Sequence, residues 1–313
     1  MRIIVHGQEA FGKAILERLL ERDENVVAVF SAPEKKGKAR DALAAYAEEK
    51  GLPLHQPRSW KWPEPIALFQ SYKPDLCVMA NRLIFVPQSV ITAPTFGSIQ
   101  YHPSLLPRHR GPSSINWSIA MGSTKTGLTI FYPNDELDGG DILLQKECDI
   151  GPDETFGDVY FKKLFQMGVD AMMESIDLVR SGQAPRIAQD LSKGSYEGRF
   201  RKHQAQLDWA KPVGEVYNTI RAANPAPGAW ATFKGGRITI YDSARVDGAG
   251  APGEIVAVST DGMIVAAGGG AILIKQVCAV DGSKIAASDF ASRSGVVAGD
   301  CFDSFVAPVV PKG

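Results

Sequence analysis

The stretch Ser98-Ile-Gln-Tyr-His-Pro-Ser-Leu-Leu-Pro-Arg-His-Arg-Gly111 sets the interpretation of the whole chain. Its first five residues alternate as in a β-strand, so Gln100 and His102 lie on one face and Tyr101 on the other. Pro103 has no backbone N–H and cannot continue a strand ladder, so the strand is predicted to end at His102. Open α/β sheets bind ligands at the carboxyl ends of their strands, so Gln100 and His102 are candidate site residues.

Upstream of this stretch, apolar strands alternate with amphipathic helices. Strands are predicted at residues 2–6, 25–30, 52–55 and 75–80, and helices at 11–22, 39–50, 65–72 and 87–91. Such alternation is typical of an α/β fold with a doubly wound, mostly parallel, Rossmann-like sheet. Downstream, strands are expected at 126–132 and 145–150, and one long helix over 155–180.

The second half of the chain changes in character. Residues 1–183 form the α/β part, and the polar, Gly- and Pro-containing residues 184–205 are expected to be a linker. Residues 206–313 begin with a helix at 212–223 and continue with β-like runs at 231–233, 237–241, 254–258, 263–267 and 271–277. These runs predict a smaller, β-rich carboxy-terminal domain resembling a barrel.

The composition excludes several classes of protein. Among 313 residues, 34 Lys and Arg balance 35 Asp and Glu, so no overall field favours a polyanion such as tRNA. The four cysteines form no CxxC pair, which is typical of reduced thiols in a cytoplasmic protein. No apolar run approaches the ~18 residues of a membrane helix, so no membrane partner is expected. His6, His55 and His203 lack neighbours at ligand spacing, so no metal site is expected.

Two glycine-containing segments admit more than one interpretation. Gly7 to Ala14 nearly matches a phosphate-binding loop, but Ala14 lacks the hydroxyl that would hold Mg²⁺, so close packing of helix and sheet is the favoured explanation. The segment Asp135-Glu-Leu-Asp-Gly-Gly-Asp141 is either a solvated turn or a loop that approaches a ligand closely. We expect the turn interpretation to hold for Asp135 and Glu136.

The motifs resemble a known family. His-Pro-Ser-Leu-Leu-Pro-x-x-Arg-Gly, followed by Leu137-Asp-Gly-Gly-Asp141, is similar to the folate-dependent formyltransferases. Tyr101 to Gly111 and Ile115-Asn-Trp look closest to the hydrolase domain of 10-formyltetrahydrofolate dehydrogenase, with methionyl-tRNA formyltransferase more distant. The resemblance implies a catalytic domain over 1–183 and a carboxy-terminal domain, 206–313, similar to an oligonucleotide-binding fold.

The resemblance also implies roles for residues. His102 and Asp138 occupy the positions of the family's catalytic histidine and aspartate, and Asp141 would order the loop beside the folate. The segment Arg82, Leu83, Ile84, Phe85 and Val86 would bind the folate, with the backbone of its last three residues meeting the pterin. Without the resemblance, that segment is equally an ordinary loop that turns hydrophobic side chains inward.

Gln100 departs from the family pattern. Most formyltransferases carry Asn at this position and the hydrolase domain an aliphatic residue, whereas glutamine moves the amide by ~1.5 Å. Gln100 is therefore a third catalytic candidate, either as an amide donor or as an acceptor. The family's usual catalytic set consists of an Asn, a His and an Asp. Gln100 calls the first member into question for this chain but does not affect the His102–Asp138 pair.

The resulting expectation is an enzyme that removes the formyl group of 10-formyltetrahydrofolate, which is its formyl donor. Water or a small-molecule amine is the acceptor, and the sequence does not choose between them. Methionyl-tRNA formylation is the first alternative. The balanced charge counts against it, and so does the short basic loop after the second predicted strand, Lys35, Lys36, Lys38 and Arg40, because the tRNA enzymes of the resembling family carry a longer basic insertion there. A folate-binding regulator with a disabled site is the second. The sequence leaves the oligomeric state open.

Overall fold

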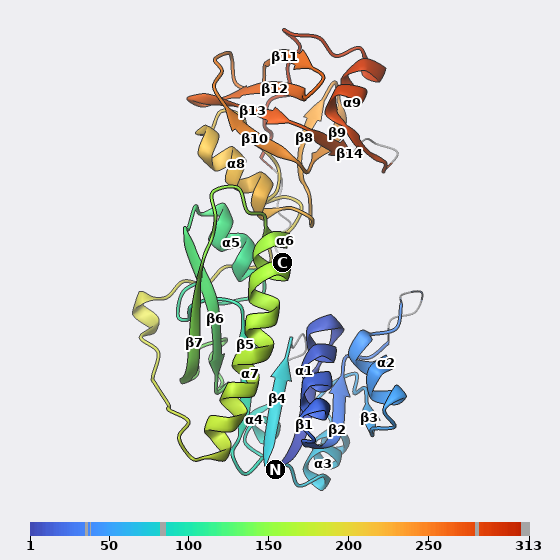
Figure 1. The fold of residues 1–313 in the computed structure, drawn as a ribbon, viewed down its shortest axis with the longest axis vertical. Coiled ribbons are helices and arrows are strands. Elements are labelled where there is room, and N and C mark those ends of the chain that lie inside the picture. Colours follow the sequence, from blue (N-terminus) through green and yellow to red (C-terminus); the bar gives the residue numbers. More distant parts are fainter. Residues whose placement is uncertain (35–36, 38, 82–85, 279–281, 308–313) are drawn as a thin grey trace. The chain divides into compact units, whose positions relative to one another are not determined.

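The computed structural model describes residues 1–34, 37, 39–81, 86–278 and 282–307 (Figure 1). The chain forms two compact units. The first contains Met1–Gly111, Gly127–Cys148 and Phe161–Tyr196, and the second contains Pro112–Thr126, Asp149–Tyr160 and Glu197–Gly313. The expected domain limits of 1–183, 184–205 and 206–313 stay a prediction.

A seven-stranded sheet forms the centre of the first unit. Its strands lie in the order β3-β2-β1-β4-β5-β6-β7, which confirms the doubly wound arrangement expected from the alternating pattern. Pairing is parallel from β3 to β5 and antiparallel between β5 and β6. The strands are β1 (Arg2–Gly7), β2 (Asn25–Ser31), β3 (Leu54–His55), β4 (Leu76–Ala80), β5 (Ser98–His102), β6 (Lys125–Phe131) and β7 (Ile142–Asp149).

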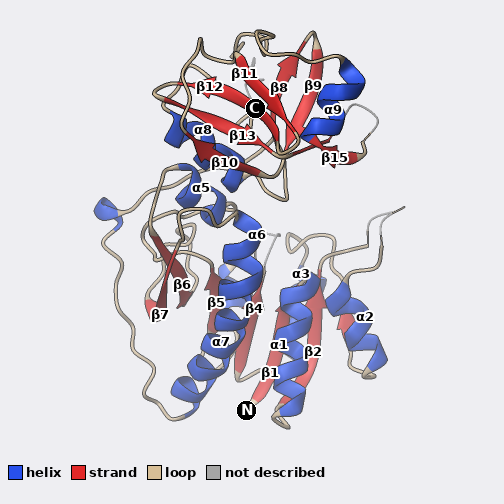
Figure 2. Cartoon of the chain, turned by 45° about the horizontal axis from the view of Figure 1, so that its top comes forward, coloured by secondary structure: helices blue, strands red, loops and turns tan. Residues whose placement is uncertain are grey.

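Helices cover both faces of this sheet (Figure 2). On one face, α1 (Glu9–Glu21) and α7 (Phe165–Arg180) place Phe11 4.3 Å from Tyr101 and 5.6 Å from Phe165, measured between ring centroids. On the other face, α3 (Pro63–Ser71) and α4 (Gln88–Ile91) share a core with β1, β2 and β4. Helix α2 (Ala42–Glu49) packs against α1. The alternation of β5 therefore turns Tyr101 towards α1, and Gln100 and His102 towards the α3–α4 face.

Close packing explains the glycines after the first strand. A Cβ atom at Gly7 would lie 2.2 Å from the carbonyl oxygen of Ala80 on β4, which is closer than any side chain can approach. A Cβ atom at Gly12 would lie 3.1 Å from Leu43 of α2. Both glycines therefore lie at close contacts, Gly7 between β1 and β4 and Gly12 between α1 and α2, rather than between a helix and the sheet.

The expected continuous helix over 155–180 is interrupted. The chain forms α6 (Phe156–Val159), a π-helical turn at Tyr160–Leu164 and then α7. Thr155 and Asp158 start α6 with reciprocal hydrogen bonds between side chains and backbone. A π-turn inserts one residue into the helical repeat, and the apolar pattern alone does not reveal it.

The second unit is rich in antiparallel strands, as expected. Its two four-stranded sheets have the orders β10-β13-β12-β11 and β15-β14-β9-β8. The predicted run 271–277 is divided between the two sheets, because it breaks at Lys275. The strands are β8 (Ala229–Phe233), β9 (Gly236–Ile240), β10 (Ser243–Val246), β11 (Ile255–Ser259), β12 (Gly262–Ala267), β13 (Gly270–Ile274), β14 (Gln276–Cys278) and β15 (Lys284–Ala286).

In the described part of this unit the sheets are accompanied by α6 and by α5 (Ser114–Ala120), α8 (Val213–Ala222) and α9 (Ala287–Ser294). The buried Arg221 of α8 donates to the carbonyl oxygens of Gly151 and Glu154 and to the side chain of Asn218. Within the described ranges, no helix has the length and apolarity needed to cross a membrane.

Candidate functional site

His102 lies at the carboxyl end of β5, where the sequence places it, and it is 5% exposed. Its Nε2 atom lies 2.9 Å from the carbonyl oxygen of His109. A carbonyl oxygen can only accept a hydrogen bond, so this contact places the proton on Nε2. Nδ1 is therefore the ring nitrogen that remains for chemistry.

Asp138 faces that nitrogen. Its Oδ2 atom lies 3.7 Å from Nδ1 of His102 and accepts a hydrogen bond of 2.9 Å from the backbone N–H of Gly111. The backbone of Asp138 is left-handed, with φ of 51°, a conformation that Asp and Asn tolerate better than most residues. Asp138 is 7% exposed, so the solvated-turn interpretation is excluded for this residue.

Gln100 completes the group from the same face of β5. Its Nε2 atom lies 3.5 Å from Oδ1 of Asp138, so the amide donates weakly towards the carboxylate. The side-chain oxygen of Gln100 is buried and, within the described part of the chain, has no hydrogen-bond partner. Gln100, His102 and Asp138 thus come together in the first unit, although up to 38 positions separate them in the chain.

The loop that carries Asp138 is held from several sides. Gln189 donates from Nε2 to the carbonyl oxygens of Asp138, at 3.0 Å, and of Gly140, at 2.6 Å. The backbone N–H of Tyr132 donates to the carbonyl oxygen of Asp141. A Cβ atom at Gly140 would lie 1.8 Å from the carbonyl oxygen of Tyr132, so only glycine fits there. These contacts fix the position of the carboxylate.

The loop after His102 is fixed in a similar way. The backbone of His109 is left-handed, with φ of 54°, and its N–H donates to the hydroxyl of Ser195 at 2.9 Å. Ser104 donates from its hydroxyl to the carbonyl oxygen of Arg108. His109 therefore contributes to this loop through its backbone carbonyl and N–H groups.

The remaining predicted residues differ in position. Val86 is 1% exposed and belongs to the core cluster that includes Trp60 and Val90. Asp141 is partly exposed and forms a 4.0 Å ion pair with Arg186. The predicted folate-binding residues Arg82, Leu83, Ile84 and Phe85 lie outside the described residues.

Tyr132 lies at the start of the same loop. Burial raises the pKa of its hydroxyl, and the nearby Arg186 guanidinium, 3.6 Å from the ring centroid, partly offsets this effect. Tyr132 therefore stays neutral at physiological pH and packs, buried, against the loop.

Among the described residues, no cluster of His, Cys, Asp or Glu has the geometry to hold a metal ion.

Sequence reasoning missed three contributors to this arrangement: the side chain of Gln189, the carbonyl of His109 and the N–H of Gly111. Two of them act through the backbone, which leaves no side-chain signal. Gln189 lies 51 residues from Asp138, in the segment interpreted as a linker, and no motif marks it. Chemically, the group offers a histidine nitrogen, a carboxylate and a free amide oxygen at one buried point. Such a set can move a proton and stabilise a developing negative charge.

Comparison with known protein families gives two matches. The family described as "Formyl transferase" matches residues 1–176, and "Formyl transferase, C-terminal domain" matches residues 199–295. Mitochondrial 10-formyltetrahydrofolate dehydrogenase of Mus musculus is 37% identical over 307 residues, covering 93% of this chain and 33% of that protein. The chain therefore spans about a third of the length of this relative. Methionyl-tRNA formyltransferase of Trichlorobacter lovleyi is 35% identical, covering 92% of this chain and 93% of that protein.

Solved structures share the fold at lower identity. The N-formyltransferase of Helicobacter canadensis, in complex with folinic acid and dTDP-3-aminofucose, has a TM-score of 0.68 and 17% identity, covering 88% of this chain and 98% of that chain. HypX of Aquifex aeolicus, in complex with tetrahydrofolic acid, has a TM-score of 0.66 and 18% identity, covering 94% of this chain and 47% of that chain. Both agree with the fold described above.

Proposed function

Because the chain belongs to the formyl transferase family, we propose that it removes the formyl group of 10-formyltetrahydrofolate and passes it to water or a small amine. The products are tetrahydrofolate and either formate or an N-formylated amine. The observation that carries the proposal is the buried pair in which Nδ1 of His102 faces Oδ2 of Asp138 at 3.7 Å. Contacts of this length are common in free enzymes and shorten when substrate binds.

The pair supplies the two proton movements that the reaction needs. The nucleophile forms a bond to the formyl carbon, and the carbonyl electron pair moves to oxygen as an oxyanion. Asp138 takes the proton that the nucleophile loses, while His102, in its imidazolium form with a proton on each ring nitrogen, donates a hydrogen bond from Nδ1 to the oxyanion. When the carbonyl re-forms, the bond from carbon to N10 breaks, and N10 leaves with the electron pair and a proton relayed through His102.

The surrounding structure supports this division of roles. The His109 carbonyl holds the imidazole ring in one orientation, and the Gly111 N–H holds one carboxylate oxygen of Asp138. Fixing both groups in advance reduces the reorganisation needed at the moment of reaction. By the family resemblance, the backbone of Val86 would meet the pterin, and the Val86 side chain is buried in the adjoining core.

The direct test is tetrahydrofolate release from 10-formyltetrahydrofolate, measured without an acceptor, with a panel of amines and with initiator tRNA. We expect release with water or one amine class. The substitution His102→Ala should reduce it by about 10²–10⁴-fold, the contribution of a positioned acid–base group. His203→Ala, which changes a histidine outside the site, is the matched control. Full activity in His102→Ala would remove the pair from the mechanism.

The tRNA arm addresses the strongest rival function. The similarity to a methionyl-tRNA formyltransferase along most of that protein's length is the observation that favours it. The near-neutral charge of this chain opposes it, because phosphate contacts dominate binding to nucleic acids. Formylation that requires initiator tRNA and falls steeply with salt would replace our proposal with that function.

A disabled folate-binding protein is the other rival. Folate binding without turnover in any arm of the assay would establish it. All four cysteines belong to the described residues and none forms a disulfide, which supports a reducing, cytoplasmic location for the enzyme.

A further inference from the structure

The amide oxygen of Gln100 is the least expected feature of the site. Gln100 is 7% exposed, yet its Oε1 atom has no hydrogen-bond partner among the residues that the structure describes. Folded proteins rarely leave a buried polar atom unpaired, and a catalytic role is one reason for the exceptions. Beside the His102–Asp138 pair, a substrate is a donor that Oε1 can accept from.

The orientation of this amide is fixed by its neighbour. Both oxygens of Asp138 can only accept hydrogen bonds when the carboxylate is ionised, and Oδ2 already accepts from the Gly111 N–H. The NH₂ end of Gln100 must therefore face Oδ1, where it lies at 3.5 Å. A flipped amide would place two unprotonated oxygens against each other. Oε1 is left as a free acceptor beside the catalytic carboxylate.

We propose that Oε1 of Gln100 holds the attacking nucleophile by one of its hydrogens while Asp138 removes another. The inference rests on the proposed function and narrows the acceptor to one chemical class. The nucleophilic atom must carry two hydrogens, as in water or a primary amine. Secondary amines and alcohols offer a single hydrogen, which cannot serve both Gln100 and Asp138.

This assignment gives Gln100 a different task from an oxyanion donor. Its Nε2 atom donates towards Asp138, and in this assignment the contact to the oxyanion comes from Nδ1 of His102. The extra methylene relative to Asn moves the amide by ~1.5 Å. Gln100 thereby positions the nucleophile on the side where its proton is removed.

The first arm of the test uses the unaltered protein. Tetrahydrofolate release and product mass are measured with a primary amine that supports turnover and with its N-methyl secondary analogue, and hydrolysis is compared with transfer to methanol. We expect the two-hydrogen nucleophile to react about 10- to 100-fold faster, the effect of one hydrogen bond to a reacting group. Equal rates for a primary amine and its N-methyl analogue would overturn the inference.

The second arm changes Gln100. Gln100→Met keeps the length of the side chain and removes both polar atoms. Gln100→Asn keeps the amide oxygen but, because the side chain is one methylene shorter, places it closer to the backbone. We expect Gln100→Met to lower kcat/KM for the acceptor about 10- to 100-fold and to reduce the preference for the two-hydrogen nucleophile. Gln100→Asn should be intermediate, and KM for the folate should change less than about twofold in both.

A surface glutamine provides the matched control. Gln166 on α7 donates from Nε2 to Oδ1 of Asp170 at 3.0 Å, so it repeats the amide–carboxylate contact in an exposed position. Gln166→Leu should leave both rates unchanged. Wild-type acceptor preference that persists in Gln100→Met would overturn the role of Gln100 while leaving the formyl-removing activity intact. Absence of tetrahydrofolate release in the wild type, with any acceptor, would instead overturn the proposed function and the inference together.

Discussion

Substituting alanine for Gly140 should damage the site without touching any of its reacting groups. The new Cβ atom would lie 1.8 Å from the Tyr132 carbonyl oxygen, and ordinary contact begins at 3.4 Å, so the two must separate by about 1.6 Å. That movement strains the hydrogen bonds from Gln189 to Gly140 and Asp138. We expect a loss of about 1–3 kcal/mol in the free energy of unfolding, as for other overpacked sites.

The kinetic effect should be larger than the loss of stability. Displacing Asp138 by about 1 Å is sufficient to cost ~10²-fold in turnover. Tetrahydrofolate release and thermal unfolding are measured on the same preparation, so that a misplaced loop is separated from an unfolded protein. Gly214→Ala on α8 is the control, because a Cβ atom at that position would meet no atom within 4 Å. Wild-type turnover in Gly140→Ala would show that this loop does not position the carboxylate.

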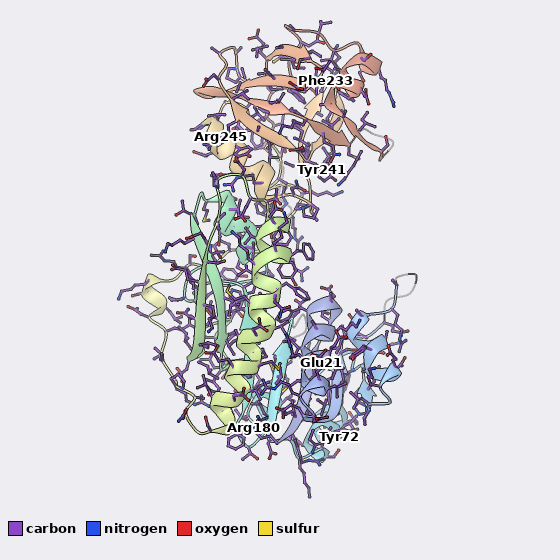
Figure 3. All side chains as sticks on the ribbon, in the orientation of Figure 1. Glu21, Tyr72, Arg180, Phe233, Tyr241 and Arg245 are labelled. Atoms are coloured by element: carbon purple, nitrogen blue, oxygen red, sulfur yellow. The ribbon has the colours of Figure 1, made fainter. Side chains whose placement is uncertain are left out.

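Three further outcomes follow from individual residues. Asp138→Asn should lower turnover by about 10²–10⁴-fold because it removes the proton acceptor. The variant should still fold normally, since Asn tolerates the left-handed backbone at this position. Steady-state rates test the loss of turnover, and circular dichroism tests the fold. Burial lowers the pKa of His55, which lies 2.7 Å from the hydroxyl of Tyr72; Figure 3 labels Tyr72 in the first unit. The folded state therefore resists protonation, and stability should fall as pH drops below 6.5. His55→Gln should make the melting temperature less dependent on pH between about pH 7 and 5. Burial, with the hydrogen bond to Asp153, raises the pKa of Tyr217 to about 12, so the folded state retains this proton and stability should fall as pH rises from 10 to 12. In urea unfolding, Tyr217→Phe should remove this loss of stability. An unchanged pH dependence in the variant would contradict this role of Tyr217.

Local patterns in the sequence predict the first unit well. Strands 2–6 and 98–102 carry apolar or alternating residues bounded by Gly or Pro, and these signals depend only on near neighbours. The strands of β10 and β15 are missed because they contain three or four residues, too few to show a period. The π-turn at Tyr160–Leu164 is missed because it changes the helical phase without changing the composition.

The site shows a similar division. His102 and Asp138 are identified from motifs, and the structure places them together, although their roles stay a prediction. The sequence cannot show that His109 and Gly111 contribute through their backbones, because backbone groups are common to all residues. The role of Gln189 depends on its contact with Asp138, 51 positions away in the chain, and no local sequence pattern predicts such a contact. The orientation of Gln100 follows only from the position of Asp138 in space.

The most direct test of the account is a single-turnover reaction of the wild-type protein and His102→Ala with 10-formyltetrahydrofolate. Formate and N-formylated amines are identified by mass, together with the tetrahydrofolate released. We expect the wild type to release tetrahydrofolate with one formyl product in equal amount, and His102→Ala to bind the folate but react at least about 10²-fold more slowly. Bound folate that stays formylated in the wild type, or equal rates in both proteins, would contradict the claim that the His102–Asp138 pair removes the formyl group.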